Sequence, residues 1–573
     1  MKKILISVIG LISAIFIFNQ INSINNSHYS EHIPETIQFS QDRLRQLMDH
    51  FSIPGVAISI VDVNSDYIWA GGFGSDITAD SIFNVASISK TFTALAVMQL
   101  VESEVIELDV PIVEYLPDFR LQSGDFENIT TRMLLNHTSG IYPELLNNFG
   151  VTFERNIPEH LNEFLENLSE REMVFEAGSE FLYSNAAYNI LGILVATMSG
   201  EKNYFDGFVS YLKANIFEPA GMFHSTFELT EDLSENLAEP YINSNISREM
   251  IFFNGVPAGG MFTTAADMGI FMQTILKGGA PIVETQTLDE MFRVQRPDFE
   301  PGIGEMQSGL GFFTRRSLEG RQLVGHGGNL PYYHSEMLLD RENGIGVFLT
   351  TNSSMGMMIA SIVAEEILER AVTEITGEES SSVVFGDSEA VMSARSKEEL
   401  QEIAGFYLLP SGQQATLRVN ENGELVYIPH MSPNLHLTLT PMSDGSFRNV
   451  AQDLIFWFEG DRMYQGMGKV FIGLRVEEKP FTHIQELESF IGRYDLILEN
   501  DLEAPMFSHI EVGVDELGIT YVRTFAAHLS PFMPLKYDGG EWFLGGQEFL
   551  FEETDEGTSV ELFGLRFLRS NFY

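Results

Sequence analysis

A serine and a lysine that could form a nucleophile and its base stand three residues apart in this sequence. Residues 83–90 read Phe-Asn-Val-Ala-Ser-Ile-Ser-Lys, and the apolar stretch 91–101 that follows predicts a buried helix. Residues i and i+3 share one helix face, so the Ser87 hydroxyl and the Lys90 amine can meet. A serine needs a nearby base to attack a carbonyl, and burial disfavours the charged form of a lysine. The pair predicts acyl transfer through Ser87, although an N-cap serine beside an exposed lysine fits the same pattern.

A tyrosine and an asparagine two residues apart, Tyr183 and Asn185, stand where a loop opens another helix. Tyr183 could relay a proton if a neighbouring cation lowered its pKa. Asn185 could bind both Lys90 and a substrate amide. On its own, the pattern is more typical of a core tyrosine beside a capping asparagine.

A run of small residues follows His326, which is succeeded by Gly327, Gly328 and Asn329. Small residues beside a strand let a substrate lie against the backbone, where N–H groups can stabilise an oxyanion. His326 could polarise a substrate carboxylate or the proton relay. A tight turn carrying a surface histidine is the alternative interpretation.

The elements that must position these groups alternate between strand and helix. Residues 56–62 and 67–72 predict a β-hairpin, and residues 346–351 predict a further strand. Residues 355–371 predict a helix. Strands at both ends with helices between them indicate an α/β (α+β) domain, in which distant segments form one antiparallel sheet.

The chain after this domain differs in kind. Residues 376–397 are acidic and serine-rich, which is typical of a linker. Glu-Ile-Ala-Gly-Phe-Tyr at 402–407 is echoed by Ser-Phe-Ile-Gly-Arg-Tyr at 489–494, and short strand patterns separated by turns follow both copies. We therefore expect two antiparallel all-β modules, each a small barrel or sandwich, at residues 398–482 and 483–573.

Composition excludes several classes of protein. The 573 residues include 81 acidic and 33 basic side chains, for a formal net charge of −48, and no cysteine. Phosphate backbones and anionic membrane surfaces repel such a surface, so we expect no nucleic-acid partner. The 13 histidines form no H-E-x-x-H or comparable cluster, so we expect no catalytic metal and no cofactor.

The N-terminus has the layout of a secretory signal. Lys2 and Lys3 precede a mostly apolar run at 4–18, and a polar stretch follows at 19–30. We expect residues 1–30 to be a signal peptide or, if uncleaved, a membrane anchor, which would be the only contact with a membrane. The protein is then extracellular or on the cell surface.

The three motifs together resemble the serine β-lactamase-like family, which includes class C β-lactamases, low-molecular-weight penicillin-binding proteins, esterases and D-aminopeptidases. Ser-x-x-Lys, Tyr-x-Asn and His-x-Gly follow one another in that family's order. Three further segments look like the family: Ile-Pro-Gly-Val-Ala at 53–57, Leu-Leu-Asn-His-Thr-Ser-Gly-Ile at 134–141 and Pro-Ala-Gly-Gly-Met-Phe-Thr-Thr at 257–264. The resemblance implies a hydrolase domain over residues 31–375, with an antiparallel sheet flanked by helices and a helical lobe.

The resemblance also implies roles for the first two motifs. Ser87 matches the acylated nucleophile and Lys90 its activating neighbour. Tyr183 matches the general base and acid, and Asn185 matches the contact to the substrate amide.

The third motif departs from that of the β-lactamases. His326 stands where class C enzymes have lysine, and Gly328 lies in the strand segment that binds substrate. The backbone N–H groups of Ser87 and Asn329 match the oxyanion hole. A histidine is charged only part of the time, so the resemblance points away from β-lactam carboxylates and toward peptidase or esterase members.

The expected function is that of a secreted serine hydrolase acting on a small-molecule or peptide substrate, an amide or ester. D-aminopeptidases also carry two β modules, so D-amino-acid peptides are favoured. The alternatives are a penicillin-binding D,D-carboxypeptidase, a β-lactamase or a carboxylesterase. From another class, a vestigial hydrolase could act as a cell-wall or partner-binding protein.

Overall fold

The computed structural model divides the chain into two compact units. One comprises Met1–His137, Val151–Arg171 and Asn185–Val383, and the other comprises Thr138–Gly150, Glu172–Ser184 and Val384–Tyr573. The predicted signal or anchor at 1–30 lies outside the described residues. The structure describes residues 33–573 except 75, 142–150, 153–157, 170, 174, 244–245, 248–249, 296–305, 318–320, 378–391, 409–413, 421, 430–435, 450–453, 461, 466–469, 477–491, 497–506, 515–519, 527–531, 539–540, 545–546, 549, 555–556, 563–564 and 570–573.

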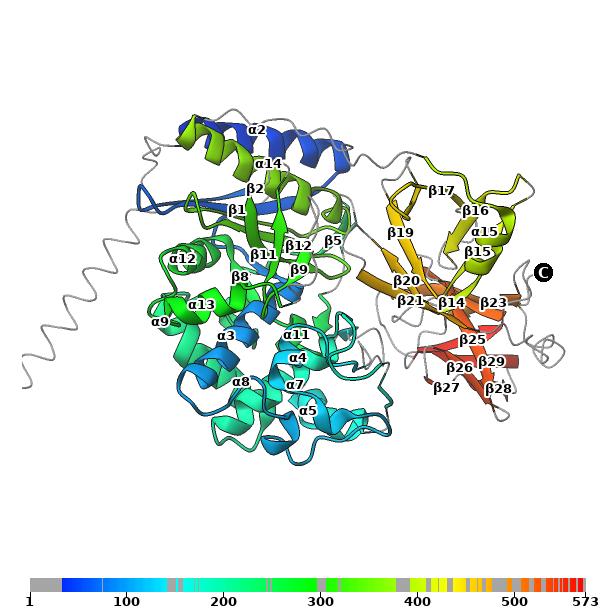
Figure 1. Cartoon of the computed structure of the whole chain (residues 1–573). Helices are drawn as coiled ribbons and strands as arrows, with labels where there is room; N and C mark the ends of the chain where they lie inside the picture. Colours follow the sequence, from blue (N-terminus) through cyan, green and yellow to red (C-terminus); the bar gives the residue numbers. More distant parts are fainter. Residues whose placement is uncertain are drawn as a thin grey trace, which may run out of the picture. The chain divides into compact units, whose positions relative to one another are not determined.

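A seven-stranded antiparallel sheet forms the centre of the first unit (Figure 1). Strand β1 pairs with β2 in a hairpin and with β13 on its other side, where Val56 lies opposite Thr351. The predicted hairpin and the sheet assembled from distant segments are therefore confirmed. In spatial order the strands are β2 (Tyr67–Gly74), β1 (Gly55–Asp62), β13 (Ile345–Thr351), β12 (His334–Asp340), β11 (Gln322–Asn329), β10 (Phe313–Arg316) and β9 (Met306–Ser308).

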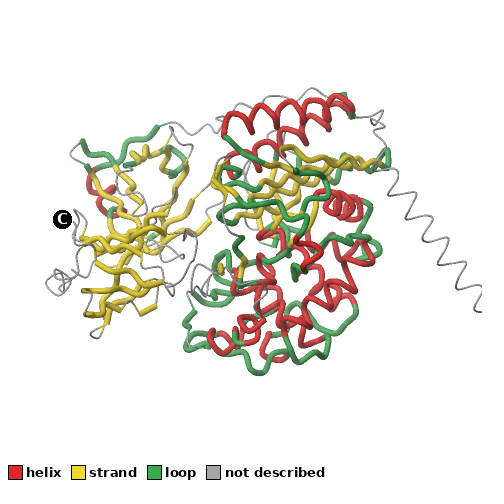
Figure 2. The backbone as a smooth tube through the Cα atoms, turned by 180° about the vertical axis from the view of Figure 1, so that it is seen from behind, coloured by secondary structure: helices red, strands yellow, loops and turns green. Residues whose placement is uncertain are grey.

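Helices cover both faces of this sheet. Helices α2 (Pro34–Phe51) and α14 (Met357–Thr376) lie side by side over one face, and α12 (Ala265–Leu276) packs on the other (Figure 1 and Figure 2). Every residue of β1 and β13 is buried, as expected for strands covered on both sides. Apolar side chains of these strands join those of α2 and α14 in one core, among them Ile37, Leu44, Ile58, Val347, Val363 and Ile367.

A carboxylate from helix α14 caps helix α2. The N-cap residue of α2, Ile33, offers no side-chain hydrogen bond. Glu374 near the end of α14 instead accepts hydrogen bonds from the backbone N–H groups of Glu35 (3.0 Å) and Thr36 (2.7 Å). Such a carboxylate satisfies unpaired N–H groups and complements the helix dipole. These hydrogen bonds join α2 to α14 at this end, and no sequence motif near either helix end predicts them.

The helical lobe is built around α3 (Ser89–Glu102). This helix is buried on most of its circumference and packs against α7 (Asn185–Met198) and α11 (Val256–Gly259), which confirms the buried helix predicted at 91–101. The other described helices are α4 (Thr131–Leu135), α5 (Pro158–Asn162), α6 (Phe164–Leu168), α8 (Tyr204–Leu212), α9 (Glu218–Ala220), α10 (Glu231–Ser234) and α13 (Thr285–Phe292). Short strand pairs join β3 (Ile82–Asn84) to β8 (Phe262–Thr264), β4 (Val151–Thr152) to β7 (Phe252–Phe253) and β5 (Tyr241–Asn243) to β6 (Ile246–Ser247).

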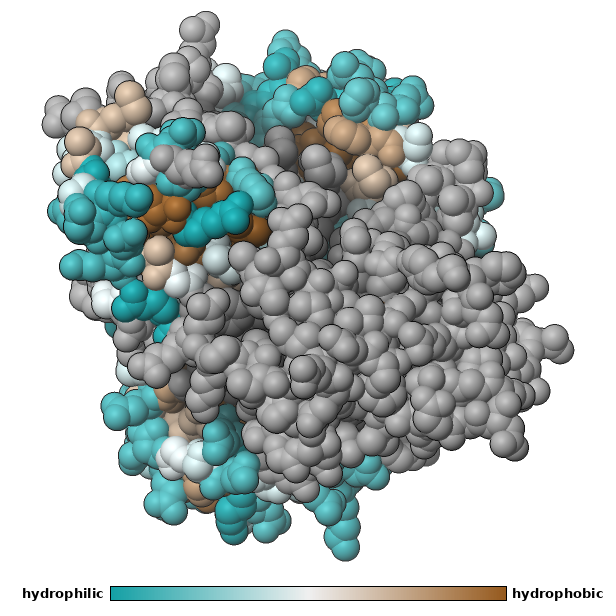
Figure 3. Space-filling model, turned by 90° about the vertical axis from the view of Figure 1, so that its right-hand side faces the viewer, coloured by the Kyte–Doolittle hydropathy of each residue, from teal (hydrophilic) through white to brown (hydrophobic). Residues whose placement is uncertain are grey.

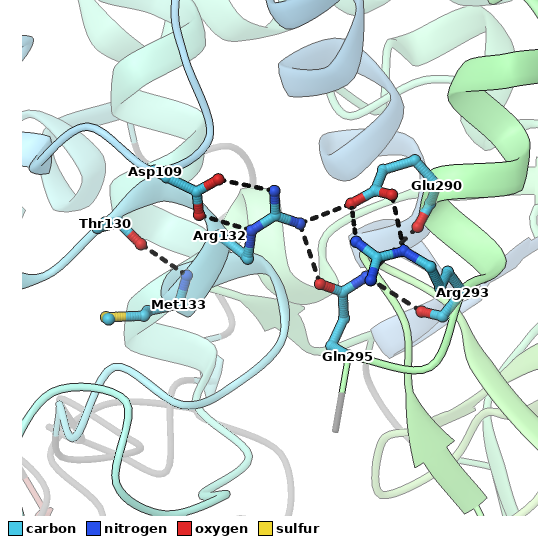
Figure 4. A network of polar contacts seen from close by, with 7 residues as sticks. All are labelled: Asp109, Thr130, Arg132, Met133, Glu290, Arg293 and Gln295. Atoms are coloured by element: carbon cyan, nitrogen blue, oxygen red, sulfur yellow. Dashed lines mark hydrogen bonds and ion pairs between the residues drawn. The ribbon is translucent and has the colours of Figure 1, made fainter. Parts of the chain in front are cut away.

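A charged network fixes α4, the short helix that leads into residues 136–137. The Arg132 guanidinium donates through Nε and Nη2 to the Asp109 carboxylate at 2.6 and 2.9 Å, and through Nη1 to Glu290 of α13 at 2.6 Å (Figure 4). Its hydrogen bond holds the pKa of the Asp109 carboxyl below the usual value. Helix α4 is therefore anchored to two separate segments.

The described residues after 392 are mainly strands, as predicted for all-β modules. A short helix, α15 (Lys397–Ile403), contributes Leu400 to the barrel core formed by Tyr407, Leu417, Leu425, Phe447 and Phe456. The strands of this closed barrel are β14 (Gly405–Leu408), β15 (Gln414–Val419), β16 (Leu425–Pro429), β17 (Leu437–Pro441), β18 (Phe447–Asn449), β19 (Leu454–Glu459), β20 (Arg462–Gln465) and β21 (Val470–Val476).

The second β module is a nine-stranded sheet. Its first strand, β22, lies between its second strand and β30, just as β14 lies between β15 and β21. This equivalence agrees with the internal repeat, while the proposed boundaries at 31, 376, 398 and 483 stay predictions. In spatial order the strands are β27 (Gln547–Glu548), β26 (Glu541–Leu544), β25 (Phe532–Asp538), β24 (Thr520–Ala526), β23 (Phe507–Val514), β22 (Gly492–Leu496), β30 (Leu565–Arg569), β29 (Gly557–Leu562) and β28 (Leu550–Thr554).

On the face drawn in Figure 3, hydrophilic side chains predominate and hydrophobic ones are confined to small areas. Within the described part of the chain, no helix combines the length and apolar character needed to cross a membrane. The large hydrophobic side chains that are clearly exposed there are Val105, Phe223, Met306 and Met392.

Candidate active site

The serine and the lysine of the first motif meet, as their spacing predicts. Ser87 lies in a 3₁₀ turn, Ala86–Ile88, directly before α3, and Lys90 lies in the first turn of that helix. The Lys90 Nζ and the Ser87 Oγ are 3.2 Å apart. The N-cap position of α3 belongs to Ile88, so the alternative of a capping serine is wrong.

Lys90 is fully buried, and the described contacts give its ammonium group three acceptors. Nζ donates to the Asn185 side-chain oxygen at 2.6 Å, to the Ala258 carbonyl at 2.7 Å and to Ser87 Oγ at 3.2 Å. It also lies 5.6 Å from the centre of the Tyr188 ring, a cation–π distance. A buried charge is tolerated only when it is paired or hydrogen-bonded. The exposed-lysine alternative is therefore excluded, and the site holds a cation against the serine hydroxyl.

Asn185 of the second motif contacts this cation. Asn185 is the first residue of α7, and its side chain contacts Lys90 as the sequence suggested. Tyr183 is half-buried two residues earlier and belongs to the second unit. Its approach to Ser87 and Lys90 stays a prediction.

The third motif lies within strand β11 rather than beside a strand or in a tight turn. His326 is buried, with its ring centre 4.9 Å from that of Phe313 and its Nδ1 2.6 Å from the Gly327 carbonyl oxygen. Burial, reinforced by the charge of Lys90, lowers the pKa of His326 to about 3. The expectation that His326 is charged part of the time is therefore corrected, because the ring is neutral near pH 7.

Gly328 permits a close approach between β11 and the nucleophile turn. A Cβ atom at this position would lie only 2.0 Å from the Val85 carbonyl oxygen and 3.3 Å from the Ala86 Cβ. The neighbour observed for Gly328 is thus protein backbone, and its predicted contact with substrate stays a prediction. Close packing here brings the strand segment that ends at Asn329 next to the turn that carries Ser87.

A row of rings backs the site. The His137 ring centre lies 5.1 Å from that of Tyr188 and 6.2 Å from that of Phe313, whose other neighbour is His326. His137 is buried, and burial together with the nearby Lys90 and His326 keeps its pKa well below the usual value. A neutral ring between two aromatic rings has a packing role.

These buried histidines predict a loss of stability in acid. Burial also lowers the pKa of His334 to about 4, against an unfolded value of about 6.5. From about pH 6.5 down to the folded pKa, the unfolded chain binds protons that the folded chain does not, so the free energy of unfolding falls. Each such histidine contributes about 1.4 kcal/mol per pH unit in that window.

We expect the urea midpoint of unfolding to fall between about pH 7.5 and about pH 5, and His326→Gln to reduce that fall. The same substitution at exposed His50 is the matched control. If His326→Gln leaves the pH dependence of the urea midpoint unchanged, His326 does not contribute to the loss of stability in acid.

Two contacts at the site had no usable signal in the sequence. The Ala258 carbonyl that accepts from Lys90 is a backbone group, which any residue could supply. Asn84, three residues before the nucleophile, accepts from the Ala86 N–H at 2.8 Å, and its proximity to Ser87 was the only hint. Among the described residues, no group of three His, Asp or Glu side chains is placed to hold a metal ion.

The Beta-lactamase family model matches residues 41–371. Protein flp of Staphylococcus aureus (strain N315) is 24% identical over 331 residues, covering 55% of this chain and 63% of that protein. The chain thus spans less than two thirds of that relative's length.

Two solved structures share the fold. The octameric penicillin-binding protein homologue from Pyrococcus abyssi has a TM-score of 0.51 at 19% identity, covering 93% of this chain and 99% of that one. The D-amino acid amidase from Ochrobactrum anthropi SV3 has a TM-score of 0.51 at 23% identity, covering 60% and 99%. With a family model that matches more than half of its length, the chain belongs to the beta-lactamase family.

Proposed function

We propose that the protein is a serine hydrolase that forms an acyl-enzyme on Ser87. The observation that carries the proposal is the buried Lys90 ammonium, which contacts both the Ser87 hydroxyl and the Asn185 side chain. A cation at this distance favours negative charge on Ser87 Oγ, which is what attack on a carbonyl requires. A binding protein has no need of a charge buried against a serine.

The proposed mechanism has two steps. The Lys90 ammonium donates to Ser87 Oγ, to the Asn185 side chain and to the Ala258 carbonyl. Tyr183, the base that the family resemblance implies, starts as a phenolate and takes the Ser87 proton. Ser87 Oγ bonds to the substrate carbonyl carbon, whose oxygen becomes an oxyanion held by the N–H groups of Ser87 and Asn329. The leaving amine or alcohol takes the proton from Tyr183, and water then hydrolyses the ester on Ser87.

We infer a neutral substrate end near β11. The position that holds lysine in class C β-lactamases holds a neutral, buried histidine here, and it offers no charge to a substrate carboxylate. Small amides, peptides or esters without a carboxylate at that end fit best, and D-amino-acid amides lead the list. The fold shared with a D-amino acid amidase supports this order. Export by the N-terminal segment is part of the same proposal.

The test is intact-protein mass spectrometry of the full chain after mixing with p-nitrophenyl acetate, D-phenylalanine amide or benzylpenicillin. We expect an acetyl adduct, which mass spectrometry of a digest should place on the peptide that contains Ser87. Chromatography of the small molecules should show hydrolysis of D-phenylalanine amide in preference to the L form, and intact benzylpenicillin. Ser87→Ala should lose the adduct, whereas Ser103→Ala, an exposed serine just after α3, should keep it.

Other outcomes select the alternatives. A persistent penicilloyl adduct would indicate a D,D-carboxypeptidase, and turnover of the drug would indicate a β-lactamase and contradict the argument from His326. Ester hydrolysis alone would favour a carboxylesterase. If none of the three compounds modifies Ser87, the result would favour a vestigial hydrolase that acts as a binding protein.

A further inference from the structure

The residue before the nucleophile has an unusual backbone conformation. Ala86 has a φ of +48°, in the left-handed region that costs a residue with a side chain about 1 kcal/mol or more. Such a conformation persists only where the surrounding structure enforces it. The contacts that enforce it here therefore bear directly on Ser87, because the Ala86 carbonyl and the Ser87 N–H belong to one peptide group.

Two side chains hold Ala86, one on each side. The Asn84 side-chain oxygen accepts from the Ala86 N–H at 2.8 Å. The Ser89 hydroxyl, which is fully buried, donates to the Ala86 carbonyl oxygen at 2.5 Å. A peptide group is planar and trans, so fixing the direction of the Ala86 C=O also fixes that of the Ser87 N–H. That N–H is one of the two proposed oxyanion donors.

Ser89 also ties this turn to another segment of the site. Its oxygen accepts from the Met261 N–H at 2.9 Å, and the Met261 carbonyl accepts from the Val85 N–H at 3.0 Å. The same segment supplies the Ala258 carbonyl to Lys90. A serine that bonds only to the carbonyl three residues back is common in helices. Here the second bond makes the hydroxyl a bridge between the turn and the segment behind it.

We infer that Ser89 is a positioning residue that orients, and by hydrogen-bond polarisation strengthens, the Ser87 N–H of the oxyanion hole. The inference rests on the proposed function and deepens it. The Ser89 hydroxyl touches no reacting atom. It acts through the peptide group between Ala86 and Ser87, and its effect is felt when the substrate carbonyl becomes an oxyanion.

The experiment measures acylation of the full-length protein by p-nitrophenyl acetate, together with inhibition by phenylboronic acid, whose tetrahedral serine adduct places an oxygen in the oxyanion hole. Removing an oxyanion donor outright costs about 100- to 1,000-fold, so misdirecting one through Ser89→Ala should slow acylation by about ten-fold or more. The affinity for phenylboronic acid should fall in parallel, because both depend on the same N–H.

Thr91→Val is the matched control. Thr91 is a buried hydroxyl on the same helix that donates to the Gly311 carbonyl at 3.0 Å and does not touch the nucleophile turn. Both variants should lower the melting temperature, but only Ser89→Ala should slow acylation and weaken boronate binding. If Ser89→Ala does not fold, Ser89→Cys, with a weaker donor of similar size, should acylate more slowly than the unaltered protein.

Acylation by Ser89→Ala or Ser89→Cys at the unaltered rate, or an equal loss in Thr91→Val, would overturn the inference and leave the proposed function intact. Failure of the unaltered protein to be acylated at all would instead overturn the proposed function, and the inference with it.

Discussion

Lys90→Met is expected to slow acylation of Ser87 by about 1,000-fold or more, within the range assigned to groups that assist proton transfer. The substitution keeps an unbranched chain of similar length but removes the only cation that the described contacts place against Ser87 Oγ. It also leaves the Asn185 oxygen and the Ala258 carbonyl without their donor. The burst of p-nitrophenol from p-nitrophenyl acetate measures the effect.

The control for this variant is Lys277→Met. Lys277 is a half-exposed lysine whose Nζ pairs with Asp66. It should acylate at the rate of the unaltered protein. Circular dichroism should show that Lys90→Met is folded, since loss of the burst through unfolding would not bear on chemistry. A folded Lys90→Met protein with a normal burst would contradict the assigned role.

Gly328→Ala is expected to reduce acylation by about 100-fold although it removes no functional group. The new Cβ would lie 2.0 Å from the Val85 carbonyl oxygen, which is backbone and cannot rotate away. Strand β11 and the nucleophile turn must therefore separate. The N–H groups of Ser87 and Asn329 belong to these two elements, so the proposed oxyanion hole should widen. The ratio kcat/KM for p-nitrophenyl acetate measures the loss.

The neighbouring glycine provides the matched control. A Cβ at Gly327 would face the other side of the sheet, where its nearest contact is the end of the Glu336 side chain at 3.0 Å. That carboxylate can shift by a few tenths of an ångström, so Gly327→Ala should keep most of its activity. Equal losses in the two variants would show that β11 tolerates no side chain at all, and would refute the specific role of Gly328.

Local patterns allowed much of the first unit to be predicted. The hairpin of β1 and β2, the buried helix α3 and the contact between Ser87 and Lys90 all depend on residues close in sequence, where strand alternation and helix spacing apply. The order of the three motifs carried the family resemblance, and that resemblance predicted the fold. The family model, which matches residues 41–371, confirms that fold.

The features that escaped prediction depend on distant segments. The neutral state of His326 arises from burial by partners such as Phe313 that no spacing rule connects to it. Lys90 also donates to the backbone carbonyl of Ala258. Every residue has such a carbonyl, so the sequence does not show which one Lys90 contacts. The close approach of Gly328 to Val85 becomes visible only once the two elements are packed together.

The contact between Glu374 and the start of α2 has a consequence for biosynthesis. Glu35 and Glu374 are 339 residues apart, and β1 likewise pairs with the distant strand β13. Loop closure over such distances is slow, since its entropic cost precedes any gain from packing. A growing chain must therefore emerge almost to residue 376 before α2 is capped and β1 has both of its neighbours. Until then β1 has only its hairpin partner β2, and its other edge lacks a neighbour.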